Sequence, residues 1–359
     1  MMKLKNLVSI EGQLPPKVTF RKKDDFDKYG MRFIAEEYCN IDLSDVFPNW
    51  QHGWVADERN FHPQAVLTSM NDSKESLHLV SRISQEVYLK KHGYAFSKAI
   101  GSALIYIPEV YVKREPKSLL VMPVHSLNYT THNHWKFKEY AEYIKSLMES
   151  GSFERVTVCI HPACIRNGYW INEFKELGIE IIEGVETNDK NAFYRLKVLF
   201  SLFEYVTTNG KGSHIPYAAY CGAKVSICGP FAEYKVEDFI EDPFYKKFPD
   251  ILKPVIDYSS YESIKKLYPQ FIFDSPEQAT ENNGWAKEQL GFENKLTPRD
   301  FRILLGKNDF SVLKNYLERT FSWLKNGLRV VAANLAPNYV KKMYRSSDRS
   351  ENPHLHRLC

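Results

Sequence analysis

The residues with the clearest chemical potential form a short polar turn between an apolar run and a helix, in TTNGKGSHIPYAAYCGAKVSICG, residues 207–229. Such a turn leaves the first backbone N–H groups of the helix unpaired and lets a phosphate come close. It therefore predicts an anion site, although its serine could equally be a plain helix N-cap. The turn lacks P-loop spacing, and no G-x-G-x-x-G follows the first strand of this region. Its candidate ligand-binding residues are Asn209, Gly210, Lys211, Gly212, Ser213 and His214.

A second candidate, His161, lies directly after the apolar run RVTVCI and before Pro162, whose fixed φ helps to hold the loop. A histidine here could donate a hydrogen bond to a phosphate oxygen or act as an acid toward a leaving phosphate. The alternative is that it caps the next helix. Cys159 and Cys164 complete a C-x-H-x-x-C pattern, but no second ligand pair follows at zinc spacing, so we predict no metal site.

Two further turns carry polar residues after apolar runs. His125 follows SLLVMPV, and Glu183 and Glu186 follow IEII. A carboxylate at such a turn could accept hydrogen bonds from both hydroxyls of a ribose, although surface solvation is the alternative.

The N-terminal third offers a possible proton acceptor in the loop QHGWVADERNFHP. His52, Asp57 and Glu58 are the candidates for a base that would deprotonate an acceptor hydroxyl. Ser81 and Arg82 lie just beyond the run SLHLV and could contact an acidic sugar or a phosphate.

A scaffold of alternating strands and helices would position these residues. Between residues 118 and 290, short apolar runs alternate with helical stretches of about 10 to 15 residues. This alternation predicts βαβ units and a parallel sheet covered on both faces. Ligands of such sheets sit beyond the carboxyl ends of the strands, so the polar turns near residues 125, 161, 183 and 209 would share one rim.

The N-terminal third repeats the β, α, β pattern in SLHLVSR, ISQEVYLKKHG and ALIYI (103–107). We therefore expect an α/β fold with two Rossmann-like domains facing a cleft, over residues 1–116 and 117–295. A helical segment over 296–345 would cross both domains, followed by a flexible tail over 346–359. The helical segment is basic and amphipathic, so it could lie on an anionic membrane or pack on the core.

Composition narrows the classes of function. The net charge of +4 over 359 residues does not support general nucleic-acid binding. Six scattered cysteines favour a reducing compartment. The N-terminus lacks the apolar core of a signal peptide, and no run approaches the roughly 20 apolar residues of a membrane span. We expect a cytoplasmic protein, either soluble or peripheral at the inner face of the membrane.

The expected domains and rim resemble glycosyltransferases of the two-Rossmann-domain (GT-B) type, and more narrowly the bacterial sialyltransferases and Kdo transferases that use CMP-activated sugars. The resemblance rests on His161-Pro162, similar to their HP motif, and on Gly212-Ser213, similar to their serine motif. It implies that the histidine and the serine turn bind the CMP phosphate while a carboxylate between them holds the ribose. An acidic D/E-D/E-G motif is not present, and His214 replaces the second serine of the paired form.

The resemblance implies an inverting, metal-independent transfer of a sialic-acid-like or Kdo-like sugar from CMP to a hydroxyl. The acceptor would be a bacterial surface glycan or lipid-linked glycan, as in lipopolysaccharide or capsule, and no cofactor beyond the donor is expected. A transferase using a UDP- or GDP-sugar, a sugar-nucleotide epimerase and a non-catalytic polysaccharide-assembly protein remain the alternatives.

Overall fold

The structure is a computed structural model that describes residues 9–24, 27–43, 47–56, 62–127 and 129–307. It has an α/β fold with two parallel sheets, which confirms the predicted fold class at this level. Contacts divide the chain into two units, Met1–Pro298 and Arg299–Cys359. Both sheets lie in the first unit. The described part of the second unit ends at residue 307 and contains most of helix α13 (Pro298–Leu304).

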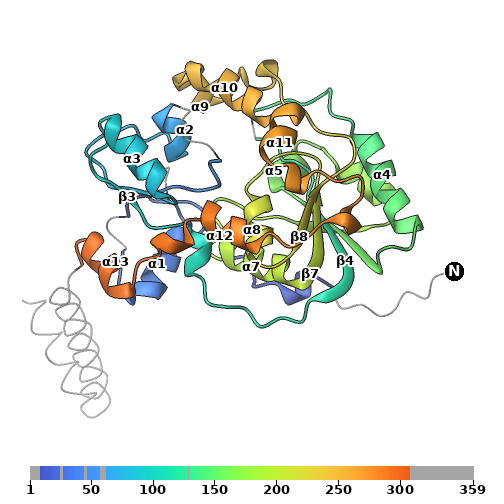
Figure 1. Cartoon of the computed structure of the whole chain (residues 1–359), viewed down its shortest axis with the longest axis horizontal. Coiled ribbons are helices and arrows are strands. Elements are labelled where there is room, and N and C mark those ends of the chain that lie inside the picture. Colours follow the sequence, from blue (N-terminus) through green and yellow to red (C-terminus); the bar gives the residue numbers. More distant parts are fainter. Residues whose placement is uncertain (1–8, 25–26, 44–46, 57–61, 128, 308–359) are drawn as a thin grey trace, which may run out of the picture. The chain divides into compact units, whose positions relative to one another are not determined.

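The larger sheet has five parallel strands in the order β6-β5-β4-β7-β8 (Figure 1). The strands are β4 (Glu115–Val121), β5 (Arg155–Ile160), β6 (Glu180–Glu183), β7 (Phe203–Thr208) and β8 (Lys224–Ile227). The chain moves outward from β4 to β6 and returns to β7 on the other side of β4. The loops after β4 and β7 therefore diverge at the carboxyl edge, which is where open parallel sheets bind ligands.

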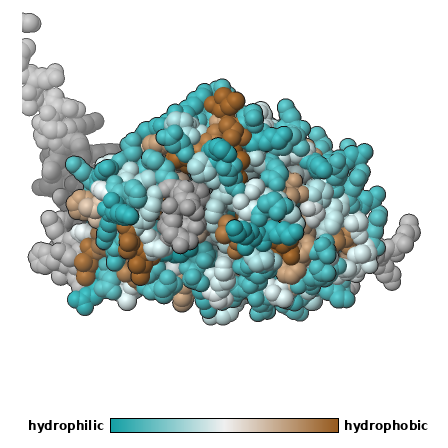
Figure 2. Space-filling view, turned by 45° about the horizontal axis from the view of Figure 1, so that its top comes forward, coloured by the Kyte–Doolittle hydropathy of each residue, from teal (hydrophilic) through white to brown (hydrophobic). Residues whose placement is uncertain are grey.

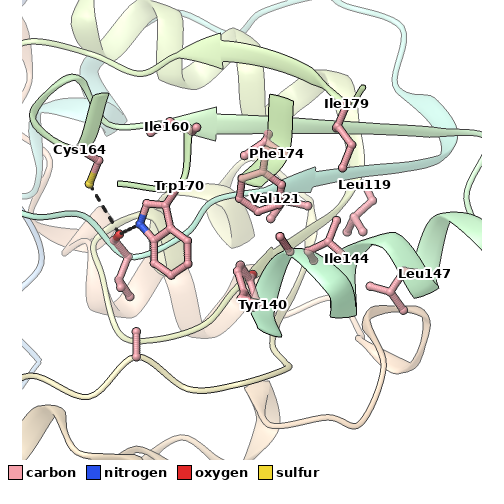
Figure 3. Close-up of a cluster of buried hydrophobic side chains, with 14 of the residues drawn as sticks. Leu119, Val121, Tyr140, Ile144, Leu147, Ile160, Cys164, Trp170, Phe174 and Ile179 are labelled. Atoms are coloured by element: carbon pink, nitrogen blue, oxygen red, sulfur yellow. Dashed lines mark hydrogen bonds between the residues drawn. The ribbon is translucent and has the colours of Figure 1, made fainter. Parts of the chain in front are cut away.

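Helices connect these strands. They are α4 (Phe137–Glu149), α5 (Pro162–Arg166), α6 (Ile171–Glu176), α7 (Ala192–Leu202) and α8 (His214–Tyr220). Helix α4 buries residues 140, 144 and 147, whose spacing of three and four places them on one helical face. Figure 3 shows the resulting cluster, in which Leu119 of β4 and Ile144 of α4 are both fully buried.

The smaller sheet consists of the parallel strands β1 (Asn49–Trp50), β2 (His78–Val80) and β3 (Ser97–Ala99). Helices α2 (Pro63–Leu67) and α3 (Ile83–Lys91) lie between its strands in the chain. A second apolar cluster joins Val66 of α2, Val80 of β2 and Leu89 of α3. This small core holds the loop after β1, which carries His52.

One predicted strand of the smaller domain is wrong. The apolar run ALIYI forms the 3-10 helix η3 (Ala103–Tyr106), and the strand lies upstream in the more polar Ser97–Ala99. Gly101 turns the chain between them with φ of +84°. The run is apolar because it is buried on all sides, and a short buried run does not reveal by periodicity whether it is a strand or a helix.

The segment between η1 (Glu11–Gln13) and α1 (Met31–Cys39) contacts the loop after β6 of the larger sheet. The N–H of Lys190 donates to the carbonyl of Val18 at 2.7 Å, and the N–H of Tyr29 donates to that of Thr187 at 2.7 Å. Gly30 has φ of +71°, and a Cβ there would lie 2.0 Å from the Lys190 carbonyl oxygen. Val18, Tyr29 and Gly30 therefore contact the larger sheet's loop after β6, although they precede the strands of the smaller sheet.

The chain after β8 returns to the smaller sheet. Its elements are η4 (Val236–Phe239), α9 (Pro243–Lys247), α10 (Pro249–Ser259), α11 (Tyr261–Leu267), η5 (Pro269–Phe271), η6 (Pro276–Gln278), α12 (Asn283–Gln289) and η7 (Phe292–Asn294). Val255 and Tyr258 of α10 pack against the apolar cluster of the smaller sheet. Helix α12 packs against α8 of the larger sheet. The segment from α9 to α12 therefore contacts both sheets.

A membrane-spanning helix, which must be both long and apolar, is not found among the described residues. Figure 2 shows a mainly hydrophilic face with apolar residues in small separate groups. Most of the basic segment predicted over 296–345, and the whole of the predicted tail, lie outside the described residues.

Candidate functional site

The turn after β7 is fixed by Asn209, which is 1% exposed. Its side-chain Oδ1 accepts the N–H of Val124 at 3.0 Å, and its backbone carbonyl accepts the N–H of Ala232 at 2.8 Å. These bonds join the loops after β4, β7 and β8 at the carboxyl edge of the sheet. Asn209 is therefore a positioning residue for this edge, and its predicted contact with a ligand stays a prediction.

The two glycines of the turn allow close approaches by neighbouring side chains. A Cβ on Gly210 would lie 2.5 Å from Cγ1 of Val124. A Cβ on Gly212 would lie 2.4 Å from Cε1 of the His214 ring. Space rather than backbone conformation explains these glycines, because neither has a positive φ.

Ser213 does not cap helix α8 with its side chain. Instead, its Oγ accepts a hydrogen bond of 2.8 Å from the backbone N–H of Trp54, in the loop after β1. Gly53, with φ of +82°, brings this loop so close that a Cβ there would lie 3.0 Å from the Ser213 Oγ. The serine turn of the larger sheet thus touches the loop that carries His52.

Three histidines from different turns gather at this edge, and we call them the rim histidines: His125, His161 and His214. The rings of His125 and His161 stack with centroids 4.6 Å apart and an interplanar angle of 25°. His214 is close enough to His125 for their charged forms to repel each other electrostatically. Because β5, β4 and β7 are neighbours in the sheet, the turns that carry His161, His125 and His214 lie at the same edge although they are far apart in the sequence.

All three imidazoles are neutral near pH 7. Burial, together with His125 and Arg166, lowers the pKa of His161 to about 2. Burial and the nearby His125 lower the pKa of His214 to about 3, and burial also lowers the pKa of His125. The Nε2 atom of His214 is buried and has no hydrogen-bond partner within the described part of the chain.

Hydrogen bonds assign the proton positions on two of these rings. Nδ1 of His161 accepts the N–H of Ala163 at 3.2 Å, so Nε2 carries the proton and can donate it. Nδ1 of His125 lies 3.2 Å from the carbonyl of Ser126, so it carries the proton and leaves Nε2 as an acceptor. The edge therefore offers one neutral donor and one neutral acceptor side by side.

The N-cap alternative for His161 is correct, since its Nδ1 caps helix α5 and Pro162 occupies the first turn. His62 and Pro63 repeat the arrangement on α2, where Nδ1 of His62 accepts the N–H of Gln64 at 3.2 Å. His62 is exposed, whereas His161 is stacked on His125. The HP pair is thus a local capping unit, and only its place in the fold distinguishes the two copies.

A pocket of about 540 Å³ lies beside the serine turn, a volume typical of small-molecule sites. We call it the junction pocket, because segments from both sheets line it. They include His52 and Trp54 after β1, Tyr129 after β4, Lys211 after β7, and Asp242 and Tyr245 from the segment after β8. The rim histidines are not among the residues that line this pocket.

His52, a predicted base, lies in the junction pocket next to Thr68. Its backbone N–H donates to Thr68 Oγ1 at 3.1 Å, and its Nδ1 lies 3.2 Å from the same oxygen. Burial, followed by Lys28 and Lys22, lowers the pKa of His52 to about 3. If Nδ1–H donates to Thr68, then Nε2 carries a lone pair with which His52 can accept a proton from a hydroxyl.

The two carboxylates predicted to hold a ribose have cationic partners. Glu183 pairs with Lys17 at 2.5 Å, and Glu186 pairs with Arg166. Both carboxylates retain exposed surface, with side-chain exposures of 46% and 33%. The structure thus places them at the end of β6, as expected, but within ion pairs that a ribose would have to displace or share.

Ser81 and Arg82, predicted to bind substrate, make protein contacts at the end of β2. The Ser81 hydroxyl donates to Gln51 at 2.9 Å. The Arg82 guanidinium donates to Gln289 at 3.1 Å and to two carbonyls in the loop after β1 at 2.9 and 3.0 Å. These contacts hold the loop that forms one wall of the junction pocket, and neither residue lines the pocket.

Two predicted base candidates, Asp57 and Glu58, lie outside the described residues. Among the described residues, the carboxylate that lines the pocket is Asp242, which the sequence reasoning did not select. It is 5% exposed, and its Oδ1 accepts the N–H groups of Phe244 and Tyr245 at the start of α9. The pair Asp242-Pro243 is a recognisable helix start, but sequence alone does not show that it faces a pocket.

Within the described ranges, no group of three or more histidine, cysteine, aspartate or glutamate residues is arranged to hold a metal ion. Comparison with protein-family models, curated proteins and solved structures finds no match to this chain.

Proposed function

We propose that the protein is an inverting glycosyltransferase of the two-Rossmann-domain type, which moves an acidic sugar from a CMP-activated donor to a hydroxyl of a glycan. One observation carries the proposal: the rim histidines and the Ser213 turn meet at the strand-order switch, beside a pocket that also reaches the His52 loop. This is the place where an open parallel sheet binds a ligand, and the pocket has room for a sugar.

In this proposal, the CMP phosphate lies between His161 and the turn at Ser213. Nε2–H of His161 and the Ser213 hydroxyl proton donate to its oxygens, since Nδ1 and Oγ are already acceptors for backbone N–H groups. Fixed neutral donors stabilise the charge that develops on the leaving phosphate. Because the leaving nucleotide carries one phosphate, the proposed reaction requires no metal.

The acceptor hydroxyl attacks the anomeric carbon from the face opposite CMP, which inverts the configuration. The junction pocket supplies two groups that could take its proton, Nε2 of His52 and the carboxylate of Asp242. Asp57 and Glu58 remain predicted candidates from the same loop as His52. The acceptor is a surface or lipid-linked glycan in a bacterium, and the basic segment after residue 296 would hold the enzyme at the inner face of the membrane.

A donor with a nucleoside diphosphate is the second candidate. Lys28 and Lys211 both line the junction pocket, and two cations there would suit the extra phosphate of a UDP- or GDP-sugar.

The test is thermal stabilisation by CMP, CDP, UDP, GDP and ADP, measured on the wild type, His161→Asn and His62→Asn. A ligand at about 100 times its dissociation constant adds roughly 2.7 kcal/mol. Stabilisation by CMP alone that disappears in His161→Asn and persists in His62→Asn is the expected result. Stronger stabilisation by a nucleoside diphosphate than by CMP would mean that the donor is a nucleoside-diphosphate sugar instead of a CMP-sugar. No response to any nucleotide would overturn the proposal and favour a non-catalytic role in polysaccharide assembly.

A further inference from the structure

Lys211 is enclosed by aromatic rings at the side of the junction pocket. Its ammonium nitrogen lies 4.3 Å from the ring centroid of Tyr258 and 5.6 Å from that of Trp54. Both rings are held in place: Nε1 of Trp54 donates to Gln289 at 3.1 Å, and the hydroxyls of Tyr258 and Tyr268 lie 2.8 Å apart. The aromatic faces attract the ammonium group, but they provide neither a hydrogen-bond acceptor nor a full negative charge.

No carboxylate among the described residues pairs with Lys211. Other lysines of the chain do have such partners: Lys17 pairs with Glu183, and Lys247 pairs with Asp72 at 3.0 Å. Burial without a counter-ion lowers the pKa of Lys211 to about 7. A charge in such surroundings is costly unless an anion accompanies it.

We propose that Lys211 recognises an anionic group of the glycan substrate, a carboxylate or a phosphate, bound in the junction pocket. The inference deepens the proposed glycosyltransferase function and rests on it for the identity of the ligand as a glycan. Lys211 is the specificity-determining residue in this scheme. It selects an acidic sugar over a neutral one of similar size.

The composition of the pocket fits an acidic sugar. Among the described residues that line it, the cationic side chains are Lys28 and Lys211, and the carboxylate is that of Asp242. Trp54 and Tyr245 provide apolar ring faces on which the C–H face of a sugar can pack. His161 and Ser213, which bind the nucleotide phosphate in the proposed function, do not line the pocket, so the two anionic groups would occupy separate subsites.

Binding of the anion should be coupled to proton uptake. An anion next to the amine raises its pKa, because it favours the charged form. An amine that is only partly protonated at pH 7 must then take up a proton when the ligand binds. Affinity should therefore be nearly constant below about pH 7 and fall as the pH rises above it.

The experiment is titration calorimetry with three probes: free N-acetylneuraminate for the carboxylate, N-acetylglucosamine 1-phosphate for the phosphate, and N-acetylglucosamine as the neutral sugar. The protein variants are the wild type, Lys211→Met, Lys211→Gln and His161→Asn. Two neutral replacements guard against a packing defect in one of them, and thermal unfolding shows that each is folded. Buffers of different ionisation enthalpy report the protons taken up.

We expect at least one anionic probe to bind the wild type about tenfold or more tightly than the neutral sugar. Both Lys211 variants should lose that preference, while His161→Asn should keep it. Wild-type affinity should fall by about tenfold or more between pH 6.5 and 8.5, because most of the amine is deprotonated at the higher pH. Whichever anionic probe binds identifies the group as a carboxylate or a phosphate.

Equal binding of the anionic probe by wild type and Lys211→Met would overturn the inference, as would equal affinity for the neutral sugar. These outcomes are distinguishable from failure of the proposed function, which is measured by CMP binding that depends on His161. Anion binding without CMP binding would support anion recognition by Lys211 and overturn the proposed glycosyltransferase function. CMP binding without anion binding would keep the transferase and overturn the role of Lys211.

Discussion

The backbone N–H of Trp54 donates a hydrogen bond of 2.8 Å to the side-chain Oγ of Ser213, across 159 residues of sequence. The bond ties the loop after β1 to the turn after β7. Because Oγ is the acceptor, the hydroxyl proton of Ser213 remains able to donate to a ligand. A single serine can therefore hold the two walls of the site together and contact the substrate.

Replacing Ser213 by Ala should weaken both folding and nucleotide binding. The partly buried Trp54 N–H would lose its acceptor, which costs about 1 kcal/mol of unfolding free energy. Urea unfolding and CMP titration measure the two effects. Ser260→Ala is the matched control, since Ser260 accepts a backbone N–H at the start of α11, away from the rim. The Ser260→Ala variant should lose stability but keep its affinity for CMP. Normal CMP affinity in Ser213→Ala would contradict the proposed role of Ser213.

Replacing Gly212 by Ala should displace the His214 ring. The new Cβ would lie 2.4 Å from Cε1 of that ring, closer than real contacts allow. We expect nucleotide stabilisation to be lost, with a destabilisation of about 1–3 kcal/mol from overpacking. Gly284→Ala is the control, because a Cβ added there would have no neighbour within 4 Å and the residue sits inside helix α12. That variant should be slightly more stable than the wild type.

Replacing His161 by Ala should remove a helix cap as well as the rim imidazole. Loss of an N-cap acceptor costs about 0.5–2 kcal/mol, and Asn restores such an acceptor. We therefore expect His161→Asn to regain much of the stability lost in His161→Ala, without regaining CMP binding. Chemical denaturation and CMP-dependent melting check the two parts. Recovery of CMP binding by Asn would show that the cap, rather than Nε2–H, is what the nucleotide requires.

The neutral state of His161 predicts a pH dependence of stability. Its pKa is about 2 in the folded protein, against about 6.5 in an unfolded chain. Below pH 6.5 the unfolded state binds a proton that the folded state does not, so stability falls with falling pH by at most about 1.4 kcal/mol per unit. The stability of wild type relative to His161→Asn should decrease from pH 6.5 to 4.5. A constant difference over this range would contradict the prediction.

Arg82 should act through the pocket wall rather than on substrate. Its guanidinium donates to Gln289 and to the carbonyls of Val55 and Ala56, and replacement by Ala removes these three hydrogen bonds. Gln289 and Val55 each keep one other donor, from Trp54 and Gln85. We expect a loss of about 1–3 kcal/mol in urea unfolding. Lys253→Ala, which removes an exposed pair with Asp257, should change stability by less than about 1 kcal/mol. A higher KM with normal stability in Arg82→Ala would instead favour substrate contact.

The local sequence pattern was sufficient to predict the strands and covering helices of the larger sheet. The run RVTVCI is β5 with the bounds Arg155–Ile160, and the predicted alternation of apolar runs and helices between residues 118 and 290 corresponds to β4–β8 and the helices between them. Buried parallel strands must be apolar throughout, and their covering helices must be apolar on one face, so both leave strong patterns. The run Ala103–Ile107 was wrongly predicted to be a strand, because a short run that is buried on all sides is apolar in a helix as well as in a strand.

Chemical roles were less predictable than elements. Both His-Pro pairs cap a helix in the same way, and their surroundings separate them: His62 is exposed, whereas His161 stacks on His125. That stacking depends on β4 and β5 being neighbours in the sheet. A dipeptide cannot carry this information, because it describes two residues and not the strand beside them.

By itself, the sequence determined the α/β class, the strands of the larger sheet and the rim on which His125, His161 and the Ser213 turn lie. Only the tertiary structure decided that His52 and Lys211 share a pocket with Asp242, and that Glu183 is paired with Lys17, 166 residues away. Periodicity records which face of a segment is buried. Which segments then face each other depends on packing between distant parts of the chain, and that packing leaves no local pattern.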